Sequence, residues 1–135
     1  MCLIIKPGQE KLRAEADIVC YKIVQGKDIK HIETFYQYVP IKIGKTYESE
    51  LFVDKKFPKE VYVGIHSYVN IKDAINNVNC QFPSWTYTGY EIFIIECIIP
   101  KDSHYYLGTF NYHPCYASDK ITYVKHIKNA KELCV

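Results

Sequence analysis

Short apolar stretches separated by glycine, proline and charged residues run along this chain, and most of them favour β-strands. The most apolar stretch, Glu91 to Pro100, is typical of a strand covered on both faces. Asp17 to Val24 is also apolar on both faces, so we expect both segments to lie centrally in a sheet. Alternation and β-branched or aromatic content predict the further strands: Ile32 to Ile43 (interrupted by Pro40), Thr46 to Val53, Val61 to Ile65, Tyr105 to Phe110 and Lys120 to Ile127.

Helical spacing is clear in one region, directly after Asn70. Asp73 follows three positions later as an imperfect capping box, and the apolar positions at helical spacing are Ile71, Ala74, Ile75 and Val78. The tail from Lys128 to Leu133 is expected to form a short helical turn. These elements predict a single α+β domain over residues 1–135. It is β-dominated, with a twisted, mainly antiparallel sheet of about six strands, one principal helix and the C-terminal turn.

Polar side chains gather where the Val61 to Ile65 strand is expected to end and the helix to begin. His66, Ser67 and Tyr68 follow the strand, and Asn70 precedes the helix. An imidazole, a hydroxyl, a phenol and the first helix amides would converge here, where a phosphate or carboxylate could bind. We therefore predict a site for a small anionic, nucleotide-like ligand at this junction. The alternative for His66 is a structural or merely exposed residue at a strand end.

Residues from other segments are expected to complete this site. Lys45 would supply a positive charge, and Tyr47 begins the strand that follows it. Trp85 and Tyr87, in the aromatic loop after the helix, would form a stacking lid over the ligand. The predicted ligand-binding set therefore joins the strand–helix junction to two loops.

Net charge and cysteine content limit the classes of binding partner and the cellular compartment that we expect for this protein. The net charge is +2, and Arg13 is the one arginine among 17 basic residues, which argues against specific nucleic-acid binding. No apolar run approaches the roughly 18 residues of a membrane span, and the N-terminus lacks the apolar core of a secretory signal. The cysteines match no zinc or redox spacing, so we expect no metal and no cofactor, with Cys20 and Cys97 as buried free thiols. We expect a cytoplasmic protein without a membrane partner, for which a homo-oligomer is allowed.

Three other groups of residues have two readings each. Glu96 interrupts the most apolar strand. We interpret it either as a paired structural carboxylate or as an acid or base in a cleft. Ser118 and Asp119 precede the last strand and favour a turn over a ligand contact. A metal site would require the loops that carry His104, His113 and Cys115 to meet, and loops collect such residues without function.

Several short motifs, in order, resemble small uncharacterised proteins of phages, prophages and gut bacteria. They are Y-V-P-I-K-I-G-K-T-Y at residues 38–47, G-I-H-S from Gly64, N-x-x-D-A from Asn70 and A-S-D-K-I from Ala117. Ile65 stands where that pattern prefers phenylalanine. The resemblance implies an origin and an architecture. Our first hypothesis for function is a binder of a small anionic ligand, such as a phage-derived accessory or counter-defence protein that sequesters a metabolite or signal.

The order of elements is also similar, more loosely, to ADP-ribosyltransferase-like folds. The positions that this resemblance implies are Tyr21 in the first strand, His66 or Ser67 in the second, and Glu96 or Asp119 later in the chain. It implies an alternative function, a transferase or glycohydrolase that acts on a nicotinamide dinucleotide. A third hypothesis is a protein-interaction module, which would carry an exposed aromatic patch and no enclosed pocket.

Overall fold

The computed structural model describes residues 3–5, 9–34, 39–54, 60–77 and 91–129. Within these ranges the chain forms one helix, at residues 71–77, and a sheet of 13 strands. The strands are β1 (Leu3–Ile4), β2 (Leu12–Arg13), β3 (Ile18–Gly26), β4 (Ile32–Glu33), β5 (Pro40–Ile41), β6 (Thr46–Glu48), β7 (Phe52–Asp54), β8 (Glu60–Val63), β9 (Ile65–Tyr68), β10 (Glu91–Ile99), β11 (His104–Phe110), β12 (His113–Ser118) and β13 (Lys120–Asn129).

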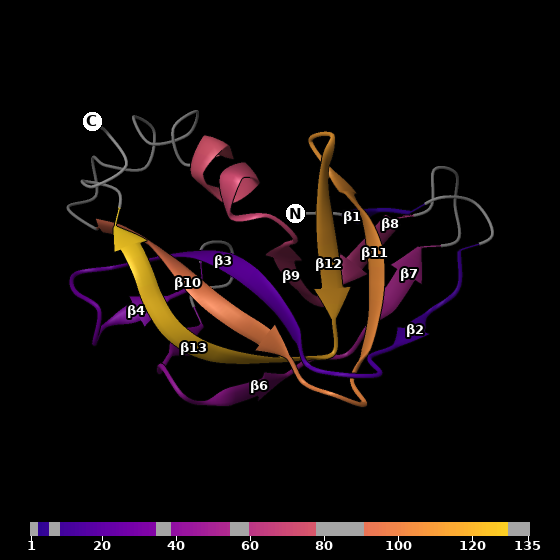
Figure 1. The fold of residues 1–135 in the computed structure, drawn as a ribbon, viewed down its shortest axis with the longest axis horizontal. Coiled ribbons are helices and arrows are strands. Elements are labelled where there is room, and N and C mark those ends of the chain that lie inside the picture. Colours follow the sequence, from indigo (N-terminus) through magenta and orange to yellow (C-terminus); the bar gives the residue numbers. More distant parts are fainter. Residues whose placement is uncertain (1–2, 6–8, 35–38, 55–59, 78–90, 130–135) are drawn as a thin grey trace.

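The sheet is antiparallel and strongly curled. Its main path runs β6-β13-β10-β3-β9-β12-β11-β1-β8-β7, while β2 pairs with β11 and the short β4 connects β3 to β5. The long strands β3, β10 and β13 form one half and curve away from the half built on β11 and β12, and the helix lies above the bend between them (Figure 1). Strands β3 and β10 pair along nine positions, from Ile18 opposite Ile99 to Gly26 opposite Glu91. The two most apolar segments are therefore central neighbours.

The prediction of an α+β fold with about six strands is wrong, because the chain breaks its apolar segments into more and shorter strands. The segment Thr46 to Val53 contains two strands, β6 and β7, which lie at opposite ends of the main path. Gly64 adopts a φ of 153° and separates β8 from β9, which then pair with different strands. A glycine with this backbone conformation can end one strand and start the next without steric cost.

Two segments expected to be irregular or helical are strands. The segment that carries His113 and Cys115, which the sequence analysis places in a loop, is β12, and it forms a hairpin with β11 through Asn111 and Tyr112. The predicted C-terminal helical turn begins inside β13, which continues to Asn129, and the rest of that turn lies outside the described residues. Both elements gain backbone pairing with a neighbouring strand, a contribution that local propensity does not report.

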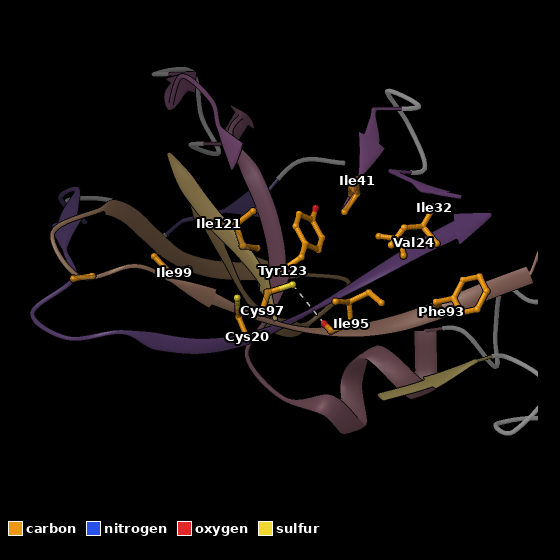
Figure 2. Close-up of a cluster of buried hydrophobic side chains, with 11 residues drawn as sticks. Cys20, Val24, Ile32, Ile41, Phe93, Ile95, Cys97, Ile99, Ile121 and Tyr123 are labelled. Carbon is orange, nitrogen blue, oxygen red and sulfur yellow. Dashed lines mark hydrogen bonds between the residues drawn. The ribbon is translucent and has the colours of Figure 1, made fainter. Parts of the chain in front are cut away.

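The two faces of the sheet carry separate hydrophobic cores. The first, here called the helix-side core, is covered by Ile71, Ala74 and Ile75 of the helix. The second, the opposite core, is drawn in Figure 2 on the other side of β3 and β10 from the helix. Alternation divides β10 between the cores: Ile92 and Ile94 belong to the first, and Ile95 and Cys97 to the second.

The opposite core contains the two cysteines that the sequence places in apolar strands. Cys20 and Cys97 lie directly opposite each other on β3 and β10, and both are free, fully buried thiols, as predicted. Burial raises the pKa of the Cys20 thiol to about 11. Such thiols are protonated near neutral pH and behave as small hydrophobic side chains.

Candidate functional site

The backbone at Gly64 decides where the side chain of His66 points. Val61 is fully buried, so continued alternation would turn His66 to the other face of the sheet. The break at Gly64 shifts the alternation by one residue, as a β-bulge does, and His66 and Tyr68 then join Val61 in pointing inward. His66 consequently lies within β9 rather than at an open strand end.

The ring of His66 is 8% exposed and contacts backbone on both sides. Its Nε2 is 3.1 Å from the carbonyl oxygen of Val61, and its Nδ1 is 3.2 Å from that of Gly64. Burial lowers the pKa of the ring to about 4, although both carbonyls act in the opposite direction. The imidazole is thus neutral near pH 7 and donates through one ring nitrogen only, to the carbonyl oxygen of Val61 or to that of Gly64.

The neighbours of His66 point in two directions. Ser67 is buried on the opposite face of the sheet, on the side of the Cys20 thiol. Tyr68 is buried in the helix-side core, where it contacts the same layer as Ala117. The three consecutive residues therefore do not converge on one hollow.

Asn70 accepts the first backbone hydrogen bonds of the helix. The backbone amides of Asp73 and Ala74 donate to the carbonyl oxygen of Asn70, at 3.2 and 3.4 Å. The side-chain amide of Asn70 donates to a carboxylate oxygen of Asp73 at 3.4 Å, which reverses the usual direction of a capping interaction. Asn70 is exposed, and the carboxylate of Asp73 lies beside the first helix turn, where an anionic ligand was expected.

The remaining predicted residues lie elsewhere. Lys45 is exposed, and its ammonium nitrogen lies 5.4 Å from the ring centre of Tyr47, a cation–π contact. Tyr47 in turn packs edge-on against Tyr123 of β13, so this pair belongs to the opposite core. Trp85 and Tyr87 lie outside the described residues.

A different set of polar residues meets on the helix side of the sheet. Glu96 of β10 lies directly opposite Tyr21 of β3, and Tyr21 lies opposite Tyr68 of β9. On the other side Glu96 faces Lys125 of β13, with 3.9 Å between carboxylate and ammonium. Directly opposed residues share a face. This face is the helix side of the sheet, because Tyr68 belongs to the helix-side core and Tyr21 packs against that core. We call Lys125, Glu96, Tyr21 and Tyr68 the cross-strand row.

Exposure along the cross-strand row falls steadily towards the helix. The side chain of Lys125 is 65% exposed and that of Glu96 26%, Tyr21 is half-buried, and Tyr68 is 4% exposed. Ile94, two residues before Glu96 on the same face of β10, is fully buried, so the carboxylate of Glu96 stands at the margin of an apolar surface. The row combines an accessible charge pair with phenolic rings, which is a suitable surface for a polar, flat small molecule.

An acid–histidine pair borders the buried end of the row. Nδ1 of His113 lies 3.1 Å from a carboxylate oxygen of Asp73, which joins β12 to the helix. Cys115 is two residues further on β12, directly opposite Tyr68. Burial raises the pKa of this thiol to about 12, and the negative charge of Asp73 adds to the effect. Cys115 is therefore a protonated core residue, while His113 keeps a partly exposed ring.

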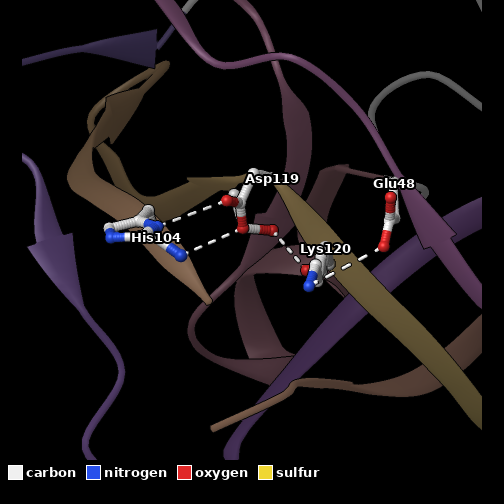
Figure 3. Close-up of polar contacts among 5 residues, drawn as sticks. Glu48, His104, Asp119 and Lys120 are labelled. Carbon is white, nitrogen blue, oxygen red and sulfur yellow. Dashed lines mark hydrogen bonds and ion pairs between the residues drawn. The ribbon is translucent and has the colours of Figure 1, made fainter. Parts of the chain in front are cut away.

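A second acid–histidine pair fixes the turn before β13 (Figure 3). The carboxylate of Asp119 accepts a hydrogen bond from the backbone amide of His104 at 2.9 Å and lies 3.4 Å from the ring nitrogen Nδ1. The hydroxyl of Ser118 donates to the carbonyl oxygen of Lys120 at 3.0 Å. Asp119 and Ser118 thus stabilise a turn, which is the role that the sequence favours.

His104 and His113 each pair with a different aspartate, on different elements. Among the described residues no group of three or more histidine, cysteine, aspartate or glutamate side chains could hold a metal ion.

Comparison of the chain with family models, curated proteins and solved structures finds no match. Within the described ranges, no helix has the length and apolar character needed to cross a membrane.

The cross-strand row could not be found by inspecting one segment. The resemblance to ADP-ribosyltransferase-like folds points to Tyr21 and Glu96, and a carboxylate within an apolar strand also draws attention to Glu96. Their proximity depends on the register between strands that are 75 positions apart in the chain at this point (96 − 21). Lys125, Asp73 and His113 carried no local signal for this surface.

Proposed function

We propose that the protein binds a small nucleotide-like molecule on the cross-strand row. The adenine ring would lie against Tyr21, the ribose hydroxyls would donate to Glu96, and a phosphate would lie towards Lys125. The position of Glu96 directly opposite Tyr21, on a partly exposed part of a buried face, carries this proposal. An accessory protein that sequesters a metabolite or signal needs such a binding surface and no further chemistry.

Calorimetry with AMP, ADP-ribose and a nicotinamide dinucleotide tests the proposal. We expect at least one of them to bind the wild-type protein, and Glu96→Gln to weaken that binding by about tenfold or more, because a charged acceptor is lost. Glu48→Gln is the matched control, since Glu48 is an exposed carboxylate that pairs with Lys120 on β6 and β13. The proposal fails if no probe binds, or if both variants bind equally well.

A second candidate function is catalytic cleavage of a nicotinamide dinucleotide, the alternative implied by the looser resemblance. It is favoured by one observation: Tyr21 and Glu96, two of the implied positions, are opposed on adjacent strands. Of the candidates for the remaining position, Ser67 points to the other face and His66 is tied to backbone carbonyls. Release of nicotinamide, abolished by Glu96→Gln and retained by Glu48→Gln, would support catalysis, whereas intact dinucleotide after incubation would support simple binding.

A further inference from the structure

A hollow of about 360 Å³ opens on the opposite face of the sheet from the cross-strand row. Its lining combines three isoleucines with two lysines: Ile29, Lys30, Ile41, Lys42 and Ile43. Ile41 belongs to the opposite core and is almost fully buried, whereas Ile43 is partly exposed at the surface. The hollow therefore has an apolar floor that continues into the core and a rim that carries positive charge.

Hydrogen bonds order the main chain at both lysines of the rim, while their side chains are exposed. The amide of Lys30 donates to the carboxylate of Asp28 at 2.9 Å. The amide of Lys42 donates to the hydroxyl of Tyr47 at 2.8 Å, and its carbonyl accepts from Lys45 at 3.3 Å. A rim that is ordered before binding loses less conformational entropy when a ligand arrives.

The two ammonium groups have no carboxylate partner among the described residues. The acid nearest to Lys30 in sequence, Asp28, is instead engaged with the ring of His31 at 2.8 Å and with the backbone amide of Lys30. Two uncompensated cations beside an apolar floor are complementary to a molecule with an anionic head and an aliphatic tail.

We propose that this hollow binds a free aliphatic carboxylate, whose chain covers Ile29, Ile41 and Ile43 and whose head lies between Lys30 and Lys42. The site is separate from the nucleotide-like site, because its floor belongs to the opposite core. Loss of either proposal leaves the other unaffected, since the probes and the variants differ.

Titration with decanoate, below the concentration at which it aggregates, tests the proposal. Each pair of methylenes removed from the probe should weaken binding by about tenfold, because each contributes apolar contact. Decanol, which has the same chain without charge, should bind more weakly than decanoate. The double variant Lys30→Glu with Lys42→Glu should bind decanoate at least tenfold more weakly.

The matched control carries the same change in net charge at Lys72→Glu and Lys101→Glu, two exposed lysines outside the hollow. It should bind decanoate as the wild type does. Equal loss in both double variants would indicate a general charge effect and would overturn the site.

Methyl NMR of the unmodified protein provides a readout that does not depend on variants folding. Decanoate should shift the methyl signals of Ile41 and Ile43 and leave those of Ile71 and Ile75 on the helix unchanged. Shifts confined to the helix methyls would overturn the proposal. Cosedimentation with phosphatidylglycerol vesicles without binding of free decanoate would also overturn it, because the occupant would then be a lipid surface.

Discussion

Glu96 on β10 lies directly opposite Tyr21 on β3, within the most extensively paired part of the sheet. A carboxylate at this place is costly unless it is paired or solvated, and the pairing with Lys125 is long, at 3.9 Å. A leucine or isoleucine would suit the surrounding strand better. A charged group on this partly buried face therefore favours a role in binding over a role in stability.

This conflict between stability and binding gives a first prediction. Glu96→Leu should raise the free energy of unfolding by about 1 kcal/mol, since it adds apolar contact beside Tyr21 and Ile94 and removes a partly desolvated charge. The same change should abolish binding of the nucleotide-like ligand. Urea unfolding and calorimetry measure the two effects separately. A variant that is less stable than the wild type would indicate that Glu96 and Lys125 are chiefly a structural pair.

The sequence was most informative about individual strands and least informative about how they pair. Both β3 and β10 lie where continuous apolar runs predict them, because burial on both faces leaves a strong local signal. Strand β12 was missed, since its histidine, proline and tyrosine residues resemble a loop until β9 and β11 pair with it. Register between distant strands is a property of the whole sheet.

The predicted binding site depended on one assumption about local geometry. If Val61, Val63 and Ile65 had formed one uninterrupted strand, His66 would have pointed away from the helix-side core, to the other face of the sheet. Gly64 changes the alternation. An isolated glycine inside a strand pattern is a local signal of such a bulge, but the regular spacing of Val61, Val63 and Ile65 favours an uninterrupted strand. His66 therefore enters the packed layer near Val61, and the polar cluster seen in the sequence is divided between the two faces.

The buried ring of His66 should make stability depend on pH in the acidic range. Its pKa is lowered from 6.5 to about 4, so the unfolded chain binds a proton more readily than the folded protein between these values. The contribution of the neutral His66 ring to the free energy of unfolding is fully present above pH 6.5, decreases as the pH falls to about 4, and does not change further below that pH. The full loss is on the order of 3 kcal/mol.

Urea unfolding at several pH values measures this loss, and His66→Gln should flatten it. His31→Gln is the control, because His31 is an exposed ring paired with Asp28. An NMR titration of the wild-type ring provides an independent check. A pKa of His66 near 6.5 would contradict the prediction even if the glutamine variant did not fold.

The helix-side core should be sensitive to loss of volume at Ile94. This side chain is fully buried on β10 and packs in the same cluster as Ala74 of the helix. Ile94→Ala should lower the free energy of unfolding by about 2 to 5 kcal/mol, because a cavity forms under the helix. Val19→Ala, at an exposed position of β3, should cost less than about 1 kcal/mol. Equal losses in urea unfolding would mean that Ile94 is not a central packing residue.

The turn of the β11–β12 hairpin contains a strained residue that can be relieved. Asn111 and Tyr112 both have positive φ, 49° and 66°, as a two-residue hairpin turn requires, and Tyr112 is fully exposed. Asparagine tolerates this conformation, whereas tyrosine pays a steric cost of about 1 kcal/mol and gains no packing in return. Tyr112→Gly should therefore raise the free energy of unfolding by about 0.5 to 1 kcal/mol.

Tyr112→Ala separates backbone strain from loss of the aromatic ring. Alanine keeps the Cβ atom that causes the strain, so its stability should stay within about 0.5 kcal/mol of the wild type. Thermal unfolding of the three proteins under one condition gives the comparison. If the alanine variant gained as much as the glycine variant, the ring itself would be the destabilising element. If both lost stability, Tyr112 would be making contacts that hold the hairpin in place, and the positive φ would be compensated.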